Sequence, residues 1–255
     1  MLSPERHTRI LQALTESPAV RVADLAATLG VSDMTIRRDI DLLDEKHLLK
    51  KIHGGASRLD VLSSIEPGFA YQADKQLRAK RHIAARARQL IADGMTIALG
   101  AGTTTVQLAG MLVDVERLTV ITNSIKAAEK LYALDPRNTT VILTGGQRTP
   151  SEALVGPLSV AAINSLKVDL CFLGVHGIHP SGLSTPNLPE AQSNAAFIKA
   201  SRKLVILADH TKFGLRALAS FASLDQVNVL ITDSGLPKKT EEDYRALVPE
   251  LLVAA

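Results

Sequence analysis

One stretch of sequence decides the fold of the N-terminal part of the chain: Gly30-Val31-Ser32-Asp33-Met34-Thr35-Ile36-Arg37-Arg38-Asp39-Ile40-Asp41-Leu42-Leu43. The hydroxyl of Ser32 is a typical helix N-cap, and apolar residues recur behind it at helical spacing, at Ile36, Ile40 and Leu43. These features predict a helix that packs through its apolar face. The opposite face then carries four side chains near the helix start: Met34, Thr35, Arg37 and Arg38.

A shorter helix is expected over residues 22–29, and Gly30 would end it in a tight turn. Two short helices joined by a glycine turn, with basic residues early in the second, are typical of a helix-turn-helix whose second helix enters the major groove. Arginine reads guanine edges through two hydrogen bonds, and hydroxyl side chains reach phosphates. A small helical bundle with incidental arginines is the alternative.

The segment behind these helices argues against that alternative. Residues 48–59 place apolar strand residues on both sides of the turn Gly54-Gly55, which predicts a β-hairpin, or wing. Basic residues at the base of the wing would face backbone phosphates. The sequence therefore predicts a winged helix-turn-helix over residues 1–57, with these DNA-contacting residues: Ser32, Met34, Thr35, Arg37, Arg38, Lys50, Lys51 and His53.

Four motifs in this region occur together: Val31-Ser32, Thr35-Ile36-Arg37-Arg38-Asp39, Leu42 and His53-Gly54-Gly55-Ala56. Residues 6–57 that contain them resemble the N-terminal signature of the DeoR family of bacterial regulators. The resemblance implies that the helix after Ser32 enters the major groove and that Thr35, Arg37 and Arg38 contact DNA. One departure is Ile52, where valine is common.

The composition is that of a globular protein. Hydrophobic residues make up 46% of the 255 residues and charged residues 22%, which excludes general disorder. No run approaches the ~20 apolar residues that cross a bilayer, and the opening residues lack a signal-peptide stretch, so we expect a cytoplasmic protein with no membrane partner. The single cysteine, Cys171, is expected to be a small buried hydrophobe.

The net charge of +3 does not itself indicate nucleic-acid binding. Residues 1–60 hold equal numbers of acidic and basic side chains, so the excess arises in the rest of the chain. DNA binding must therefore depend on where individual charges are placed.

Residues 58–74 show no sustained periodicity and are interpreted as a linker to a second domain over residues 75–255. A helix is expected over residues 74–91. Its basic residues are interpreted as a solvated face, and a surface for DNA phosphates or an acidic partner is the alternative: Lys75, Arg78, Lys80, Arg81, Arg86 and Arg88.

Beyond Gly94, short apolar runs alternate with helical patterns. The runs cover residues 96–99, 118–122, 140–144, 168–175, 203–208 and 227–232, and a final helix is expected over residues 241–252. This alternation predicts a mostly parallel, Rossmann-like α/β domain, with helices on both faces of the sheet. Ligands of such domains bind beyond the carboxyl ends of the strands.

The loops at those strand ends carry the unusual residues of the domain. Glycines and hydroxyls in Gly100-Ala101-Gly102-Thr103-Thr104-Thr105 suit a phosphate, although Thr103 as a plain helix cap is an alternative. The loop lacks the lysine of a nucleotide-triphosphate P-loop. Polar residues in the other loops indicate a polyhydroxylated anion, and the predicted contacts are Gly100, Gly102, Thr103, Thr104, Thr105, Asn123, Gly145, Gly146, His176, Gly177, Glu190, Asp209 and Lys212.

Matching motifs recur through this half: Gly102-Thr103-Thr104, Thr144-Gly145-Gly146, Leu154-Val155-Gly156-Pro157, Gly182-Leu183-Ser184-Thr185-Pro186 and Lys212-Phe213-Gly214. Residues 75–235 thereby resemble the DeoR effector domain, whose fold is related to sugar-phosphate isomerases. The resemblance implies a phosphorylated sugar effector and a homodimer or homotetramer. Gly100 and His176 stand where many relatives have aspartate, so the identity of the sugar does not carry over.

Two other function classes fit the sequence less well. A sugar-phosphate isomerase or lactonase needs a positioned acid and base, which Asp209, Lys212 and Glu190 would supply. However, residues 175–178 hold no acid, and an isomerase has no use for a recognition helix. A purely structural DNA-binding protein would not need the polar loops.

The sequence therefore predicts a regulator that is not an enzyme and needs no cofactor or metal. We expect it to repress a carbohydrate-use operon through operator DNA, with a sugar phosphate relieving repression. The sign of that response stays open at this point, as do the operator and the role of the tail.

Overall fold

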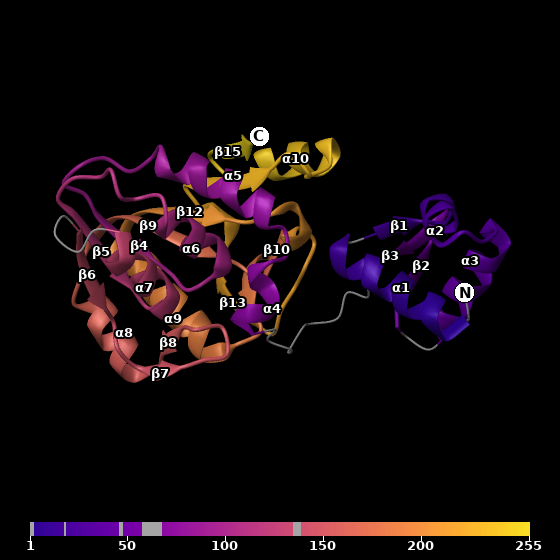
Figure 1. Ribbon diagram of the computed structural model, residues 1–255, viewed down its shortest axis with the longest axis horizontal. Helices are drawn as coiled ribbons and strands as arrows, with labels where there is room; N and C mark the ends of the chain where they lie inside the picture. The colour runs from indigo at the N-terminus through magenta and orange to yellow at the C-terminus, as the bar shows by residue number, and fades with distance from the viewer. Residues whose placement is uncertain (1–2, 18, 46–47, 58–67, 135–138) are drawn as a thin grey trace. The chain divides into compact units, whose positions relative to one another are not determined.

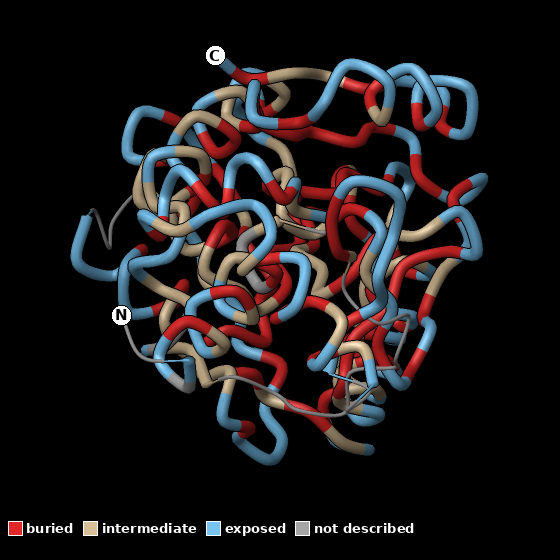
Figure 2. Tube along the Cα trace, turned by 90° about the vertical axis from the view of Figure 1, so that its right-hand side faces the viewer, coloured by how far each residue is buried: buried red, intermediate tan, exposed pale blue. Residues whose placement is uncertain are grey.

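The computed structural model describes residues 3–17, 19–45, 48–57, 68–134 and 139–255. The chain divides into two compact units, residues 1–61 and 62–255, and the division falls inside the predicted linker (Figure 1). Each unit has its own buried apolar core. Figure 2 marks the buried residues along the chain. Among the helices of the described ranges, none combines the length and apolar character that a bilayer crossing requires.

The first unit is a winged helix-turn-helix, as predicted. The helix α2, Val22–Leu29, is capped by Gly30, whose φ of 66° is a left-handed conformation that glycine adopts without strain. The next helix begins behind Ser32, whose hydroxyl accepts a hydrogen bond from the Thr35 amide at 3.3 Å. The elements are α1 Ser3–Glu16, β1 Ala19–Arg21, α2 Val22–Leu29, α3 Asp33–Glu45, β2 Lys50–Ile52 and β3 Gly55–Ser57.

The strand β1 was not predicted. It pairs antiparallel with β3, so the wing is a three-stranded sheet in the order β1-β3-β2. The pairing explains the second glycine of the turn, because a Cβ at Gly55 would lie 2.0 Å from the carbonyl oxygen of Val20. The glycine pair therefore makes the turn and also admits the extra strand.

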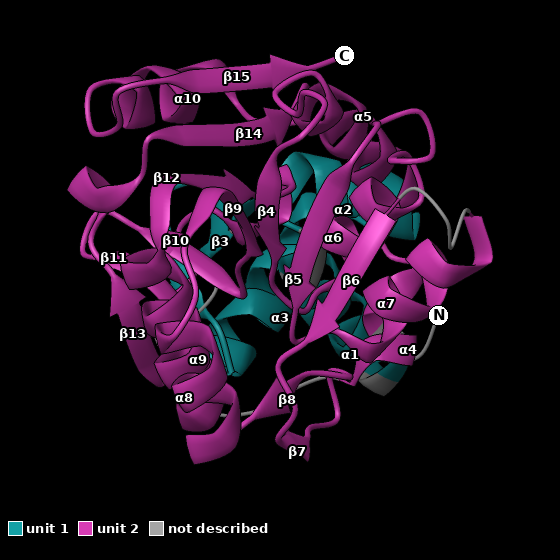
Figure 3. Cartoon of the chain, turned by 90° about the vertical axis from the view of Figure 1, so that its left-hand side faces the viewer, with its two compact units in different colours: residues 1–61 teal, residues 62–255 magenta. Residues whose placement is uncertain are grey.

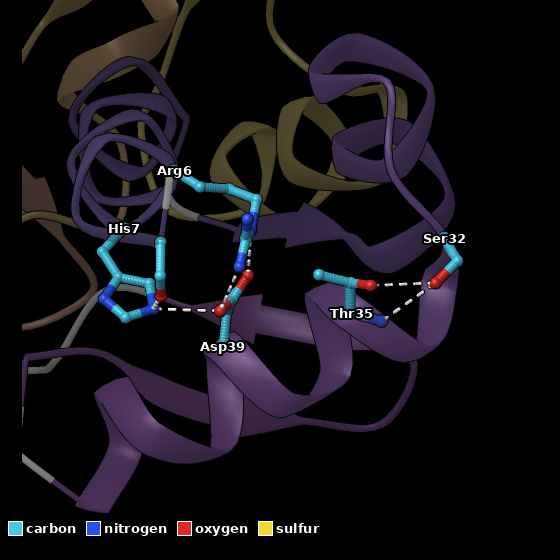
Figure 4. Close-up of polar contacts among 6 residues, drawn as sticks. Arg6, His7, Ser32, Thr35 and Asp39 are labelled. Atoms are coloured by element: carbon cyan, nitrogen blue, oxygen red, sulfur yellow. Dashed lines mark hydrogen bonds and ion pairs between the residues drawn. The ribbon is translucent and has the colours of Figure 1, made fainter. Parts of the chain in front are cut away.

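A buried ion pair joins α1 to α3 (Figure 4). The Arg6 guanidinium donates to Asp39 from Nε at 2.5 Å and from Nη2 at 3.0 Å, and His7 Nε2 lies 2.9 Å from the same carboxylate. Burial opposes ionisation of Asp39, but the hydrogen bonds from Arg6 and His7 outweigh it and lower the pKa of this carboxyl. The contact fixes how α3 sits on α1.

The second unit is built on a seven-stranded parallel sheet in the order β15-β14-β12-β9-β4-β5-β6 (Figure 3). All six predicted strands are present, and the predicted fold class is confirmed. The strands are β4 Thr96–Leu99, β5 Leu118–Thr122, β6 Thr139–Leu143, β9 Val168–Gly174, β12 Ser201–Leu207, β14 Val229–Asp233 and β15 Leu251–Ala254.

Helices cover both faces of this sheet, because alternate strand residues point to opposite sides. Ile97 and Leu99 pack into one core and Ala98 into the other. The first core is covered by α5 Leu77–Arg88, α6 Thr103–Ala109 and α7 Ile125–Leu134, and the second by α8 Pro157–Asn164, α9 Leu188–Ala200 and α10 Lys238–Arg245.

The C-terminal tail corrects the prediction of a helix over residues 241–252. The helix α10 ends at Arg245, and residues 251–254 form β15, which pairs parallel with β14. Pro249 cannot continue a helix, and the apolar run behind it completes the edge of the sheet. Also unpredicted are the pair β7 Gln147–Arg148 and β8 Leu154–Val155, and a small sheet of β10 Gly177–His179, β11 Gly182–Thr185 and β13 Ala219–Ala222.

The predicted linker is too long at its C-terminal end. Residues 69–73 form the short helix α4, Phe69–Ala73, and the Phe69 amide donates to the carbonyl oxygen of Pro150 at 3.0 Å. The end of the predicted linker therefore packs on the second unit, because its backbone groups find partners there. Residues 58–67 of the predicted linker lie outside the described residues.

The Arg6–Asp39 contact predicts acid sensitivity of the first unit. A carboxyl whose pKa is lowered by folding stabilises the fold above its unfolded value of 3.8 and loses that contribution as the pH falls. Asp39→Asn should therefore lower the Tm of this unit at pH 7 by roughly 5 °C or more. Circular-dichroism melts from pH 7 to pH 3 should show the difference from wild type shrinking below about pH 4.

The exposed acid Glu45 on the same helix supplies the matched control, and Glu45→Gln should melt like wild type. Equal melting of Asp39→Asn and wild type at pH 7 would contradict the stabilising role of the ion pair.

Candidate functional site

The exposed face of α3 carries the predicted DNA-reading side chains. Met34 is 61% exposed, Arg37 and Arg38 are exposed, and the Thr35 hydroxyl lies 2.9 Å from that of Ser32. The opposite face is held in the core of the unit. The first turns of α3 thus present an apolar group and two guanidinium groups together, which suits thymine methyl groups, guanine edges and phosphates.

The wing is tied to α3 by two contacts. Lys51 Nζ lies 2.5 Å from Asp41 Oδ1, and the Lys51 amide donates to Asp44 Oδ1 at 3.0 Å. Lys50 and His53 are exposed on the same hairpin. The Lys51 ammonium is therefore paired with Asp41 and helps to orient the wing. The sequence analysis had predicted only a contact with DNA phosphate for it.

The second unit holds a cavity of about 120 Å³ at the carboxyl edge of its parallel sheet. The loops that line it follow β4, β5, β9 and β12, which are neighbours in the sheet. The chain runs from β4 toward one edge of the sheet and from β9 toward the other, so the cavity lies at the point where the strand order reverses.

Most of the predicted ligand contacts line this cavity. They are Gly102, Thr103, Thr104, Asn123, His176, Glu190, Asp209 and Lys212. They come from far-apart positions in the sequence, and the parallel topology brings them together. Their contact with a ligand stays a prediction.

Five predicted contacts do not line the cavity: Gly100, Thr105, Gly145, Gly146 and Gly177. Thr105 is buried, and its hydroxyl donates to the carbonyl oxygens of Gly100 at 2.7 Å and Gly102 at 2.9 Å, which closes the glycine-threonine loop from behind. The last three allow close backbone packing or a turn. A Cβ at Gly146 would lie 2.3 Å from Val155 O, and one at Gly177 would lie 2.4 Å from Leu215 O.

Asn123 lines the cavity but already has partners. Its Oδ1 accepts from the Ala101 amide at 2.9 Å, and its Nδ2 donates to Leu154 O at 3.2 Å. The side chain therefore joins the loop after β4 to the segment before α8. It shapes the cavity more than it offers a free group to a ligand.

Lys80 is the main correction to the sequence analysis, which placed it on a solvated basic face. Lys80 is only 2% exposed and lines the cavity. Burial lowers the pKa of Lys80 to about 8, against the opposing attraction of the Asp209 carboxylate. The available signal was helical spacing, because Lys80 precedes the buried Ile83, Ala84 and Ala87 on one face of α5.

Other lining residues also escaped the sequence analysis, among them Phe69, Gln72, Ser151, Thr185 and Asn194. Ser151 and Thr149 orient a predicted residue, because both hydroxyls donate to Glu190 Oε1, Thr149 at 2.8 Å. Thr185 lies in the motif at residues 182–186, which did not mark it as a ligand contact, and the others belong to no recognisable motif, so their places in the lining follow from the tertiary fold.

The chemistry of the cavity is mixed. Two ammonium groups, Lys80 and Lys212, share it with the carboxylates of Asp209 and Glu190 and with several hydroxyls. Ammonium groups and hydroxyls suit an oxyanion, and carboxylates accept hydrogen bonds from a polyol. Cys171 plays no part here, since it is fully buried and burial raises the pKa of its thiol.

A winged helix-turn-helix joined to a parallel α/β unit with a polar cavity defines a DNA-binding transcription regulator. The family model of the DeoR-like helix-turn-helix domain matches residues 6–61, and that of the DeoR C terminal sensor domain matches residues 75–234. The chain belongs to the DeoR family of transcription regulators.

Curated relatives match along nearly the whole chain. The regulator GolR of Listeria innocua is 37% identical over 94% of both chains, and GlpR of Haloferax volcanii is 34% identical over 96% of both. The lactose phosphotransferase system repressor of Staphylococcus aureus is 32% identical over 93% of this chain and 94% of its own.

Solved structures resemble parts of the chain. Ribose 5-phosphate isomerase A from Neisseria gonorrhoeae is 18% identical with a TM-score of 0.39, over 54% of this chain and 53% of its own. The initiation factor eIF-2B of Pyrococcus horikoshii is 16% identical with a TM-score of 0.42, over 57% of this chain and 50% of its own.

The exposed start of α3 predicts that Arg37→Ala weakens specific DNA binding by roughly 1–3 kcal/mol, because a guanidinium on a base edge forms two hydrogen bonds. The measurement is fluorescence anisotropy at fixed salt, with a duplex that the wild-type chain has selected from random sequence.

Arg202→Ala removes the same charge from an exposed side chain of the second unit and should leave the affinity unchanged. If Arg37→Ala also left it unchanged, α3 would not be the reading element.

Proposed function

We propose that this chain represses a carbohydrate-use operon and that a phosphorylated sugar or sugar derivative in the cavity controls its binding to operator DNA. The observation that carries the proposal is the cavity lining, where Lys80, Lys212 and the Thr103 and Thr104 hydroxyls face the same space as Asp209 and Glu190. One part of this lining suits a phosphate and the other suits sugar hydroxyls. The name of the S. aureus relative, a lactose phosphotransferase system repressor, supports the repressor assignment.

The proposed repressor acts as a symmetric dimer or tetramer. Two copies of α3 would occupy half-sites one helical turn of DNA apart, or a multiple of it. Sugar phosphate can release the operator only if it binds one arrangement of the protein better than the other.

The proposal assigns the chain no catalytic activity. Groups suited to proton transfer do line the cavity, but Glu190 accepts hydrogen bonds from Thr149 and Ser151, and Asp209 Oδ1 accepts from the Thr211 amide at 3.1 Å. The named relatives over the whole length are regulators. Conversion of a sugar phosphate to its isomer, followed by NMR with a catalytic amount of the chain, would overturn this part of the proposal.

A thermal-shift panel tests the ligand class. It contains glucose 6-phosphate, fructose 1-phosphate, fructose 6-phosphate, tagatose 6-phosphate, ribose 5-phosphate and glycerol 3-phosphate, each beside its unphosphorylated parent. At least one phosphorylated member should raise the Tm by roughly 2–4 °C or more, as expected for a ligand well above its Kd, and its parent should not.

The double variant Thr103→Ala, Thr104→Ala should lose this shift and keep its affinity for DNA. Thr140→Ala removes an exposed hydroxyl on β6 and should behave like wild type. The effector hypothesis fails if the wild-type chain responds to no phosphorylated member.

Lys80 predicts a pH dependence of ligand affinity. Because its pKa is lowered to about 8, the free chain loses this positive charge as the pH rises through about 8. A bound phosphate favours the charged form, so binding should take up a proton and weaken by up to about tenfold for each pH unit above 8. Calorimetric titration from pH 6.5 to 9.5 measures it, and a flat profile would contradict a role of Lys80 in holding the anion.

A further inference from the structure

We propose that Lys80 transmits ligand binding to the DNA-binding unit by exchanging the carbonyl oxygen of Gln72 for the anionic group of the bound sugar phosphate, which releases α4. The inference rests on the proposed function, since it takes the cavity to be a sugar-phosphate site. It adds the route by which occupancy of that site reaches the rest of the chain.

The starting point is the incomplete pairing of a buried cation. Lys80 Nζ donates to Gln72 O at 2.5 Å, and within the described residues this carbonyl is its only hydrogen-bond acceptor. An ammonium group has three protons to donate, and a buried charge is costly unless it is fully paired. Asp209 acts on Lys80 through electrostatic attraction without a hydrogen bond between the two described side chains. Lys80 therefore has both reason and capacity to bind an anion that enters the cavity.

The helix that Lys80 holds is short and depends on outside contacts. The five-residue α4 is far below the length at which a helix is stable alone. Phe69 and Gln72 also line the cavity, so α4 is one of its walls. A ligand that draws the ammonium away from Gln72 removes a charge-assisted hydrogen bond from this wall.

The other end of α4 is attached beside the same site. The Phe69 amide donates to Pro150 O, and Pro150 lies between Thr149 and Ser151, whose hydroxyls hold Glu190. A sugar hydroxyl that engages Glu190 would compete with these two hydroxyls. Both attachments of α4 therefore lead directly to groups that face the ligand.

Release of α4 can affect the DNA-binding unit because α4 lies close to that unit in the sequence. Only residues 58–68 separate α4 from β3, the last strand of the DNA-binding unit. Whatever frees or fixes α4 changes where the connecting segment is anchored. Two states follow, one with Lys80 on Gln72 and one with Lys80 drawn onto the ligand. The ligand favours the second because the ammonium binds the anion more tightly once it has moved away from Gln72 O.

Lys80→Met tests the exchange, because it keeps the apolar stem and removes the ammonium. Without any ligand, its α4 should resemble that of the ligand-bound wild type. Backbone hydrogen exchange over residues 69–76 should be faster than in the ligand-free wild type. It should equal that of the wild type saturated with the panel sugar phosphate that stabilises it most.

The affinity of Lys80→Met for operator DNA should also match that of the ligand-bound wild type. Ligand-free Lys80→Met should have the affinity of the sugar-phosphate-saturated wild type, a change of roughly 5–150-fold, and should not respond to added sugar phosphate. Lys199→Met, which removes an exposed lysine on α9, should behave like wild type. Since a buried charge is replaced by an apolar group, the variant should melt no lower than wild type.

Two results would overturn the exchange. One is Lys80→Met with the operator affinity of the ligand-free wild type, which would make Lys80 a ligand contact only. The other is unchanged hydrogen exchange over residues 69–76 in both the variant and the saturated wild type. Failure of the proposed function is a different outcome, in which no panel member stabilises the wild type. The ligand-free comparison of exchange rates would still decide whether Lys80 holds α4.

Discussion

The reversal of strand order between β4 and β9 is the constraint on which the second unit depends. These neighbouring parallel strands send their loops to opposite sides of the sheet, which opens a space at their carboxyl ends that side chains must line. The loop after β4 supplies hydroxyls, the loop after β9 supplies His176, and β12 brings Asp209. Because α5 packs on β14 and β12, and β12 pairs with β9, Lys80 lines this space and is shielded from solvent.

Much of this arrangement follows from local sequence signals, and the exceptions have physical reasons. The turn at Gly30, the cap at Ser32 and the paired glycines of the wing each act on neighbouring residues, so the first unit could be predicted closely. β1 could not, because it has three residues and exists only through its pairing with β3. The apolar run at residues 251–254 was misread as helix because its strand partner, β14, is distant in the sequence.

The candidate site also has features that local sequence predicts and features that depend on the tertiary fold. Parallel topology places every strand end at one edge, so polar residues after strands could be predicted to gather. Which glycines would face the cavity could not be predicted, and Gly146 and Gly177 serve close backbone packing. Lys80 was misassigned because one basic residue among six on α5 and its flank belongs to the buried face, and spacing alone had to distinguish it from the rest. The part of the cavity wall that α4 forms could not be predicted, because this five-residue helix depends on tertiary contacts that its own sequence does not indicate.

Each unit contains a buried cation, and the two cations are paired differently. The difference fits a DNA-reading role for the first unit and a ligand-sensing role for the second. Arg6 meets the Asp39 carboxylate through two hydrogen bonds, so charge and geometry are both satisfied and α3 is held in one position. Lys80 meets a neutral carbonyl, and burial lowers its pKa to about 8. A satisfied ion pair suits a reading helix, whose side chains must keep their register on DNA. An incompletely paired ammonium suits a sensor. An anion that enters the cavity can supply the ion pair that Lys80 lacks, and this interaction adds to the affinity for the anion.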